Sequence, residues 1–218
     1  MKTVEITIFG GTGLIGNFLK EQMLIDRFFY KINFVTRKAF ESNHKKITNY
    51  VIDFSNLKEI SNTIKNSHIV FSAIGTTQSK VNWDKDEYRK IDYDINSNIA
   101  LACKKLKIKN FSFVSTAGAN HKSDNFYLNL KGKIEKNIIR MNLISTSIYR
   151  PSLLLGKRKD TRIGEKLAQF LMPKFSFFMP EIYKPIKAEN VALSMINISK
   201  TIQKGNKIYH YKEMIENS

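Results

Sequence analysis

The chain has 218 residues, of which 42% are hydrophobic and 25% are charged, a balance that is ordinary for a globular protein. No apolar run reaches the roughly 20 residues that a membrane helix needs, and Met1 leads into a charged segment without the pattern of a signal peptide. The single Cys103 excludes an internal disulfide, and the four histidines have no ligand spacing, so no metal site is expected. These features predict one domain over residues 1–218 in a reducing, cytoplasmic location.

The formal net charge is +17, from 36 Lys and Arg against 19 Asp and Glu. Such a charge is compatible with nucleic acid, acidic lipid or an anionic ligand. The lysines, however, are spread along the chain without a block or a helical stripe, and no nucleic-acid motif accompanies them. We interpret the charge mainly as biased residue usage and expect no nucleic-acid partner. The oligomeric state and a protein partner stay open.

Apolar strand-like segments alternate with helical ones along the chain. Strands are predicted at residues 3–9, 31–36, 49–54, 68–74, 110–116 and 144–150. Helices are predicted at residues 14–25, 56–65, 86–106 and 124–142, and from about 163 and from 188. Strands separated by helices of this length form βαβ units with right-handed crossovers. The fold class is therefore α/β, a Rossmann-type doubly wound parallel sheet, with residues 151–187 and 205–218 contributing the substrate region.

Gly10, Gly13 and Gly16 lie three residues apart in GGTGLIG, directly after the first predicted strand. A plain tight turn also favours glycine. In a dinucleotide site, Gly10 allows the sharp turn, Gly13 lets the backbone approach a pyrophosphate, and Gly16 lets helix and strand pack closely. The free N–H groups at the start of the helix then face the phosphates. The position of this turn between a strand and an amphipathic helix favours the dinucleotide site.

The segment after the second predicted strand, VTRKAF, contains Arg37 and Lys38 and no acid. An NAD-selective site usually has Asp or Glu here, whereas an arginine fork binds phosphate. We therefore predict NADPH in preference to NADH. Asp53 ends the third strand and is predicted to accept a hydrogen bond from the adenine amino group. Ile74 and Gly75, after the fourth strand, are predicted to form a smooth surface against the adenine ribose.

Tyr127 and Lys131 are four residues apart in a predicted helix, so they share one face. Tyr127 could pass a proton to or from a substrate oxygen, and Lys131 would stabilise the phenolate and hold the nicotinamide ribose. Ser115, at the end of the fifth strand, would bind and orient the substrate carbonyl. This Tyr–Lys spacing arises about once by chance in a chain so rich in lysine. The catalytic interpretation therefore depends on position, and an exposed helix tyrosine remains the alternative.

Together these residues resemble the short-chain dehydrogenase/reductase superfamily in its atypical branch, and more narrowly the family of the HIV Tat-interacting protein. The matching stretches, in chain order, are FGGTGLIG, TRK, VIDF, IGTT, VSTAGAN, YLNLKGKIE, YRPSLLL and RIGE. The resemblance implies an NADPH-binding oxidoreductase with further coenzyme contacts from Thr12, Leu14 and Ile15. It also implies that Leu154 lies near the nicotinamide and that Arg162 reaches the coenzyme or the substrate.

Two functions follow from this resemblance and from the residues. The first is an NADPH-dependent reductase that transfers hydride to a small carbonyl substrate and a proton from Tyr127. The alternative is an NADPH-binding regulatory or sensor protein with little or no turnover. The sequence does not identify the substrate, because the aromatic stretch FLMPKFSFFMP and its neighbours carry no clear code. We interpret that stretch first as core and second as the wall of a substrate pocket.

Overall fold

A seven-stranded sheet forms the centre of the computed structural model, which describes residues 4–39, 42, 44–156 and 180–218. Every pair of neighbouring strands in this sheet is parallel. Its strands, in spatial order, are β3 (Ile47–Val51), β2 (Phe29–Thr36), β1 (Val4–Phe9), β4 (Ile69–Ser72), β5 (Asn110–Val114), β6 (Ser145–Tyr149) and β9 (Gly205–Tyr209). The first six follow the doubly wound order of a Rossmann-type sheet, as predicted. β9, from the segment that the sequence groups with the substrate region, extends the sheet at one edge.

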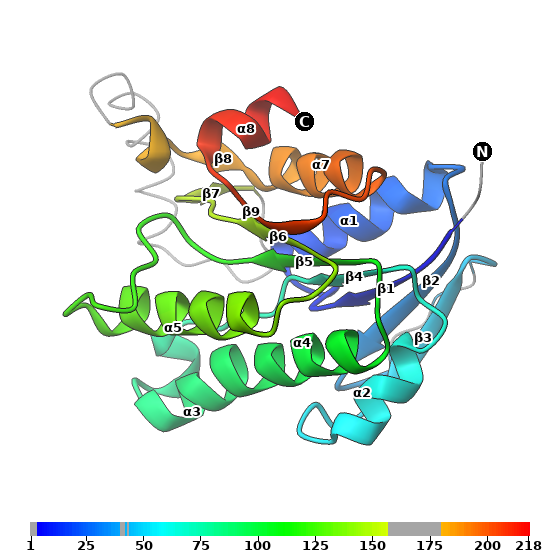
Figure 1. Ribbon diagram of the computed structural model, residues 1–218, viewed down its shortest axis with the longest axis horizontal. Helices are drawn as coiled ribbons and strands as arrows, with labels where there is room; N and C mark the ends of the chain where they lie inside the picture. Colours follow the sequence, from blue (N-terminus) through cyan, green and yellow to red (C-terminus); the bar gives the residue numbers. More distant parts are fainter. Residues whose placement is uncertain (1–3, 40–41, 43, 157–179) are drawn as a thin grey trace.

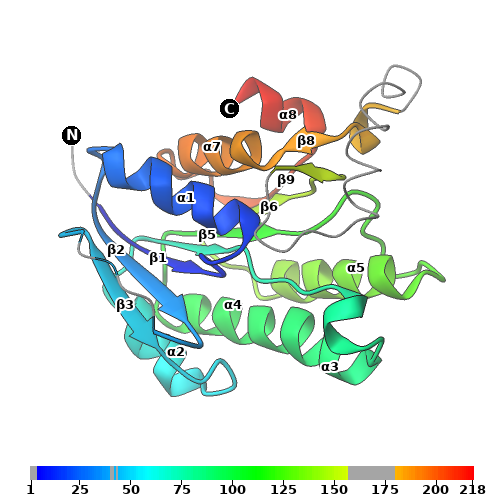
Figure 2. The same cartoon turned by 180° about the vertical axis from the view of Figure 1, so that it is seen from behind.

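Helices cover both faces of the sheet, as the views from the two sides show (Figure 1, Figure 2). The helices on one face are α1 (Leu14–Ile25), α7 (Ala188–Ser199) and α8 (Tyr211–Glu216). Those on the other face are α2 (Leu57–Ile64), α3 (Lys85–Arg89), α4 (Ile95–Lys105) and α5 (Phe126–Arg140). The central strands therefore lie between two helical layers, which explains why nearly all of their side chains are buried.

Strand β1 supplies side chains to both hydrophobic layers. Ile6 and Ile8 are fully buried in the cluster that includes Leu19 of α1, whereas Phe9 is buried with Ile60 of α2 in the other cluster. This alternation is the two-residue period of a strand. Burial on both faces fixes β1 in the centre of the sheet, so its carboxyl end opens at the middle of the sheet edge.

The predicted helix at 86–106 is interrupted in the structure. It divides into α3, a π-helical segment η2 (Lys90–Asp94) and α4. Asp84 caps α3 by accepting hydrogen bonds from the N–H groups of Asp86 and Glu87. Apolar periodicity contains no sign of a π turn, which places one extra residue in the helix.

The other predicted strands and helices within the described residues are present, with ends that differ by at most three residues. The short elements that the sequence did not predict are η1 (Gln78–Val81), β7 (Leu154–Leu155), η4 (Glu181–Tyr183), β8 (Ile186–Lys187), β9 and α8. β7 and β8 pair in parallel as a second, two-stranded sheet. The helix predicted from about 163 and the aromatic stretch before Pro180 lie outside the described residues.

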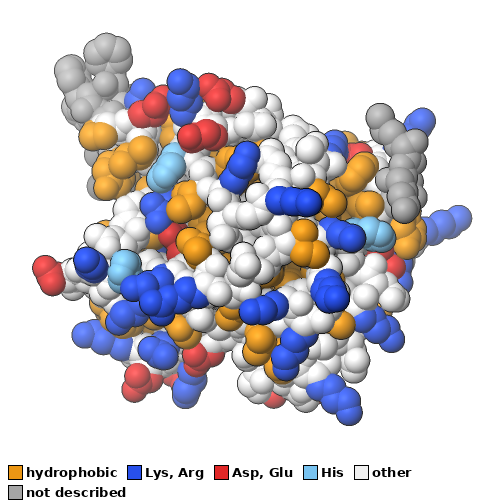
Figure 3. Space-filling view, viewed as in Figure 1, with side chains coloured by type: hydrophobic (Ala, Val, Ile, Leu, Met, Phe, Trp, Pro, Cys, Tyr) orange, Lys and Arg blue, Asp and Glu red, His pale blue; other side chains and the backbone are white. Residues whose placement is uncertain are grey.

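Lysine and arginine side chains are spread over the face of the molecule in Figure 3 and do not form one block. Around His121, burial and the nearby charges of Lys136 and Lys122 lower the pKa of the imidazole, so the local potential is positive. This distribution is compatible with biased residue usage. The absence of a nucleic-acid partner stays a prediction.

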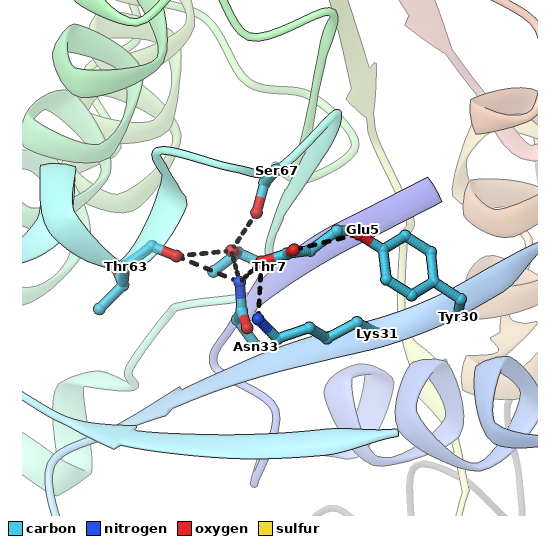
Figure 4. Close-up of polar contacts among 7 residues, drawn as sticks. All are labelled: Glu5, Thr7, Tyr30, Lys31, Asn33, Thr63 and Ser67. Carbon is cyan, nitrogen blue, oxygen red and sulfur yellow. Dashed lines mark hydrogen bonds and ion pairs between the residues drawn. The ribbon is translucent and has the colours of Figure 1, made fainter. Parts of the chain in front are cut away.

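A buried polar network connects β1, β2 and the segment that follows α2 (Figure 4). The Glu5 carboxylate accepts a hydrogen bond from Asn33 Nδ2 at 2.8 Å and pairs with Lys31 Nζ at 3.4 Å. Thr7 Oγ1 and Ser67 Oγ share a hydrogen bond of 2.7 Å. Polar groups buried in this way are stable only when they are hydrogen-bonded. The network therefore fixes how β1 and β2 meet α2, at the opposite end of β1 from the glycine turn.

Replacing Asn33 by Ala should lower the free energy of unfolding by about 1.5–3 kcal/mol, because the buried Glu5 carboxylate loses a charge-assisted hydrogen bond. Lys31→Ala is the matched control on the same carboxylate. Since the Lys31 side chain is 35% exposed, its loss should cost less than about 1 kcal/mol. Urea denaturation at neutral pH measures both variants, and equal losses would contradict this account of the network.

Candidate functional site

The chain leaves β1 through a turn in which backbone segments approach very closely. Gly10 has a φ of +76°, and a Cβ at this position would lie 2.6 Å from the carbonyl carbon of Ala73. A Cβ at Gly16 would lie 2.2 Å from the carbonyl oxygen of Gly10. Side-chain carbons do not approach backbone atoms to such distances. Helix α1 therefore begins directly against the turn because both positions are glycine.

The first turn of α1 is open toward a cavity. Gly13 is the N-cap residue and provides no side-chain acceptor, and the first turn contains no acidic residue. Among the described residues, the first N–H groups of the helix and the positive end of its dipole therefore lack side-chain partners. Gly11–Ile15 line a cavity of about 790 Å³, which lies within the size range of small-molecule sites. This arrangement fits the phosphates of a dinucleotide.

The same cavity brings together most of the predicted site residues, from the ends of β1, β4 and β5, from helices α1 and α5, and from β7. The predicted residues that line it are Thr12, Gly13, Leu14, Ile15, Ile74, Gly75, Ser115, Tyr127, Lys131 and Leu154. Gly10 and Gly16 shape the turn and do not line the cavity. Residues separated by more than a hundred positions meet here because the carboxyl ends of parallel strands open on one edge of the sheet.

Arg37 and Lys38 are exposed and lie outside the lining of this cavity. In the register of β1 and β2, Phe9 is the partner of Val35. The chain therefore leaves both strands at the same level, and Arg37 follows β2 at the sheet edge where the glycine turn lies. This position is compatible with contact to the ribose end of a dinucleotide.

Asp53 follows β3 and is exposed. Its carboxylate accepts hydrogen bonds of 2.8 Å from the backbone N–H and from the hydroxyl of Ser55, and these bonds hold its pKa below the usual value. The structure thus shows Asp53 in a local turn, away from the lining of the cavity. Arg162 lies outside the described residues.

Lys131 is 4% exposed, and its Nζ lies 2.6 Å from Oδ1 of the fully buried Asp92. The other oxygen of Asp92 accepts the backbone N–H of Thr76 at 2.8 Å. Burial disfavours the charged form of Lys131, but the Asp92 carboxylate together with Tyr127 and Glu135 offsets burial, and the pKa of Lys131 is raised. Lys131 Nζ also lies 5.9 Å from the centre of the Tyr127 ring. The site therefore holds an ammonium next to the predicted proton donor.

Ser115, at the end of β5, donates a hydrogen bond of 2.5 Å to Oε1 of Glu135. Glu135 lies one helical turn beyond Lys131 and also accepts bonds from Arg150, at 3.0 Å from Nε and 2.5 Å from Nη2. The hydroxyl proton of Ser115 is therefore already engaged in a hydrogen bond within the protein. Thr116 also lines the cavity, and its side chain makes no hydrogen bond within the described part of the chain.

A second cavity of about 480 Å³ adjoins the first, and Tyr127 lines both. The residues that line the second cavity are Thr76, Thr77, Tyr88, Asn125, Phe126, Tyr127 and Leu128. The Tyr88 hydroxyl donates to the carbonyl oxygen of Thr76 at 3.1 Å, and its ring meets that of Tyr127 edge-on at 6.2 Å. Tyr127 thus lies between the two cavities.

Sequence reasoning missed Asp92, Glu135 and Arg150. Glu135 lies eight residues after Tyr127, so its helical spacing could have placed it on the same face of α5. For Asp92, helical spacing gives no such signal, because the π-helical segment η2 determines the direction of its side chain.

The chain is similar to a described protein family and to several known proteins. A family model described as NAD(P)H-binding matches residues 10–170. Protein FMP52, mitochondrial, of Debaryomyces hansenii is 34% identical over 196 residues, which cover 88% of this chain and 86% of that protein. Protein FMP52-1, mitochondrial, of Scheffersomyces stipitis is 30% identical over 220 residues, 96% of each chain. Protein HTATIP2 of Rattus norvegicus is 28% identical over 172 residues, 78% of this chain and 70% of that protein.

Solved structures agree on the fold. The UDP-N-acetylglucosamine 4-epimerase from Methanobrevibacter ruminantium M1 superposes with a TM-score of 0.74 at 17% identity, covering 96% of this chain and 77% of that one. The Bordetella bronchiseptica enzyme WbmH, in complex with NAD+, gives 0.72 at 14% identity, covering 96% and 76%. At sequence identities this low, the structural similarity shows only that the chain has the Rossmann-type fold.

The expected cytoplasmic location is wrong. Relatives from Scheffersomyces stipitis, Debaryomyces hansenii and Candida albicans are all named mitochondrial. The lone Cys103 could not reveal this, because a chain with one cysteine forms no internal disulfide in any compartment. Within the described residues, no helix has the length and apolar character to cross a membrane.

Gly16→Ala should lower the free energy of unfolding by about 1–3 kcal/mol, since the added methyl group collides with the carbonyl of Gly10. Gly75→Ala is the control, because a Cβ there meets its nearest atoms, Asp92 Oδ1 and Lys131 Nζ, at 3.6 and 3.7 Å. That variant should stay within about 1 kcal/mol of the parent. Urea denaturation compares them, and a Gly16 variant as stable as the control would refute the close approach.

Proposed function

The chain belongs to the NAD(P)H-binding family, in the atypical branch of the short-chain dehydrogenase/reductases, and from this premise we propose that it is an NADPH-dependent reductase of a small carbonyl compound. The observation that carries the proposal is a single cavity. It is lined both by the open amino end of α1 and by Tyr127 and Lys131. A phosphate-binding element and a proton donor are thereby brought to one place.

In this proposal, the backbone N–H groups of Thr12, Leu14 and Ile15 bind the diphosphate of the coenzyme. Ile74 and Gly75 contact the adenine ribose, and Leu154 contacts the nicotinamide. Lys131 binds the nicotinamide ribose. When bound, the coenzyme supplies a hydride to the carbonyl carbon of the substrate. The cavity, the uncapped helix and the absence of a side chain at Gly13 support this placement.

Tyr127 donates its phenolic proton to the carbonyl oxygen as the carbon accepts the hydride, so that the carbonyl becomes an alcohol. The ammonium of Lys131 stabilises the phenolate that remains. The second cavity, which shares Tyr127, receives the rest of the substrate, and its lining residues Phe126 and Leu128 favour an apolar group. Ser115 orients the carbonyl oxygen in this scheme, which requires its hydroxyl to turn away from Glu135.

That requirement also favours a second candidate function, an NADPH-binding sensor with little or no turnover. In the structure the hydroxyl of Ser115 donates to Glu135, which Arg150 also holds. A site kept in this state would bind the coenzyme but would not orient a substrate. Such a protein would bind NADPH tightly while no carbonyl compound is reduced.

NADPH should bind at least tenfold more tightly than NADH, and Arg37→Ala should abolish most of that difference. A charge-assisted bond to the 2′-phosphate corresponds to roughly 10- to 100-fold in affinity. Lys65→Ala, an exposed cation after α2, is the matched control and should retain the preference. Calorimetric titrations with both coenzymes measure this. Equal affinities in the parent would show that Arg37 and Lys38 do not select NADPH.

Tyr127→Phe should reduce turnover by about 10²- to 10⁴-fold, the usual contribution of a proton donor, while NADPH affinity changes by less than about threefold. Ser115→Ala should also reduce turnover, whereas Thr116→Val should not. NADPH oxidation with a panel of small aldehydes and ketones measures these variants. If Thr116→Val were the inactive one, the orienting role would pass to Thr116. Full turnover by the Phe variant would contradict the mechanism.

A further inference from the structure

Asp92 contacts two parts of the site at once. Its Oδ1 pairs with Lys131 Nζ at 2.6 Å, and its Oδ2 accepts the N–H of Thr76 at 2.8 Å. Thr76 follows Ile74 and Gly75, which line the first cavity. One fully buried carboxylate therefore connects the loop after β4 to the lysine of α5.

Hydrogen bonds from neighbouring side chains hold the backbone at Asp92 in place. Asp92 lies in the π segment η2, and its carbonyl oxygen accepts a hydrogen bond of 2.7 Å from Asn96 Nδ2. Asn96 Oδ1 in turn accepts the hydroxyl of Ser72 at 2.5 Å, at the end of β4. Single π turns within helices occur frequently at functional sites. Here the π turn directs the carboxylate of Asp92 at Lys131.

The charge of Lys131 depends on Asp92 more than on any other described group. Tyr127 and Glu135 also face Lys131 from α5, and the ring of Phe113 on β5 lies 5.9 Å from its Nζ. Glu135, however, already accepts bonds from Arg150 and Ser115. Burial alone would lower the pKa of Lys131, and Asp92 contributes most to reversing this.

We propose that Asp92 is a positioning residue of the reaction, which keeps Lys131 charged and fixes it to the loop that binds the coenzyme. The inference rests on the proposed function, because it assigns Lys131 to the nicotinamide ribose and to the phenolate of Tyr127. Without Asp92, the same lysine would be buried without a counter-ion. It would then lose its proton, or move toward water.

The test compares Asp92→Asn with Asn96→Ala. The Asn side chain keeps the size of Asp92 and can still accept from Thr76, so the variant removes the negative charge and the oxygen that faces Lys131. Asn96→Ala removes a buried hydrogen bond to the same residue and leaves the charge of the ion pair in place. NADPH affinity is measured by calorimetry from pH 7 to 9.5, above the ionisation of the 2′-phosphate near pH ~6.

Asp92→Asn should bind NADPH roughly tenfold more weakly at the upper end of this pH range than at the lower end, as Lys131 loses its proton. The parent and Asn96→Ala should change by less than about threefold. A pH profile of Asp92→Asn parallel to that of the parent would overturn the proposal. If no carbonyl compound is reduced by the parent, the proposed reaction fails, but these binding profiles still decide whether Asp92 sets the charge of Lys131.

Stability gives a second measurement that needs no ligand. In Asp92→Asn, Lys131 binds a proton in the unfolded chain but not in the folded one, so the free energy of unfolding should rise with pH. In the parent the Lys131 pKa is raised, and its contribution should stay constant until strongly alkaline pH. If Asp92→Asn does not fold, adding Lys131→Met should restore folding. Failure of that double variant would also overturn the proposal.

Discussion

The carbonyl oxygen of Gly10 lies where a side-chain carbon of residue 16 would have to be, and this close approach decides where α1 begins. Because the helix starts directly against the end of β1, its first N–H groups open into the cavity at the sheet edge. A larger residue at Gly16 would push the helix away and displace the end of its dipole. The location of the phosphate-binding element thus follows from the packing of backbone against backbone.

The chemistry is organised by one face of α5. Tyr127, Lys131 and Glu135 follow one another at four-residue spacing, and the last two are held by charged side chains from other elements, the buried Asp92 and the partly buried Arg150. Asp92 holds Lys131 from the helix that follows β4, and Arg150 holds Glu135 from the segment that follows β6. Buried ion pairs of this kind contribute less to stability than to a defined geometry, because the cost of desolvation offsets their attraction. Their role here is to keep one helix face in register with two strand ends.

Much of the fold could be predicted from the sequence because its signals are local. Apolar runs predict buried parallel strands, and three glycines between a strand and a helix predict the phosphate turn. β9 escaped prediction because it is an edge strand, so the middle of its GNKIY segment is exposed and has no apolar run. The location of the protein was predicted wrongly, since neither composition nor a single cysteine separates one reducing compartment from another.

The polar contacts of the site could not be predicted, because each joins residues far apart in the chain. Asp92 looks like an ordinary solvated helix residue until the π turn directs it at Lys131, 39 positions later. The bond from Ser115 to Glu135 likewise depends on how α5 packs beside β5. Tyr127 and Lys131 could be found because both lie on one helix. Their partners come from other elements, and only tertiary packing reveals them.

A crystal structure of the protein with bound NADPH tests the central claim most directly. The account predicts that the diphosphate oxygens lie within about 2.7–3.2 Å of the backbone nitrogens of Thr12, Leu14 or Ile15, with the 2′-phosphate against Arg37. A coenzyme bound elsewhere on the protein, or a cavity that stays empty at saturating NADPH, would contradict it.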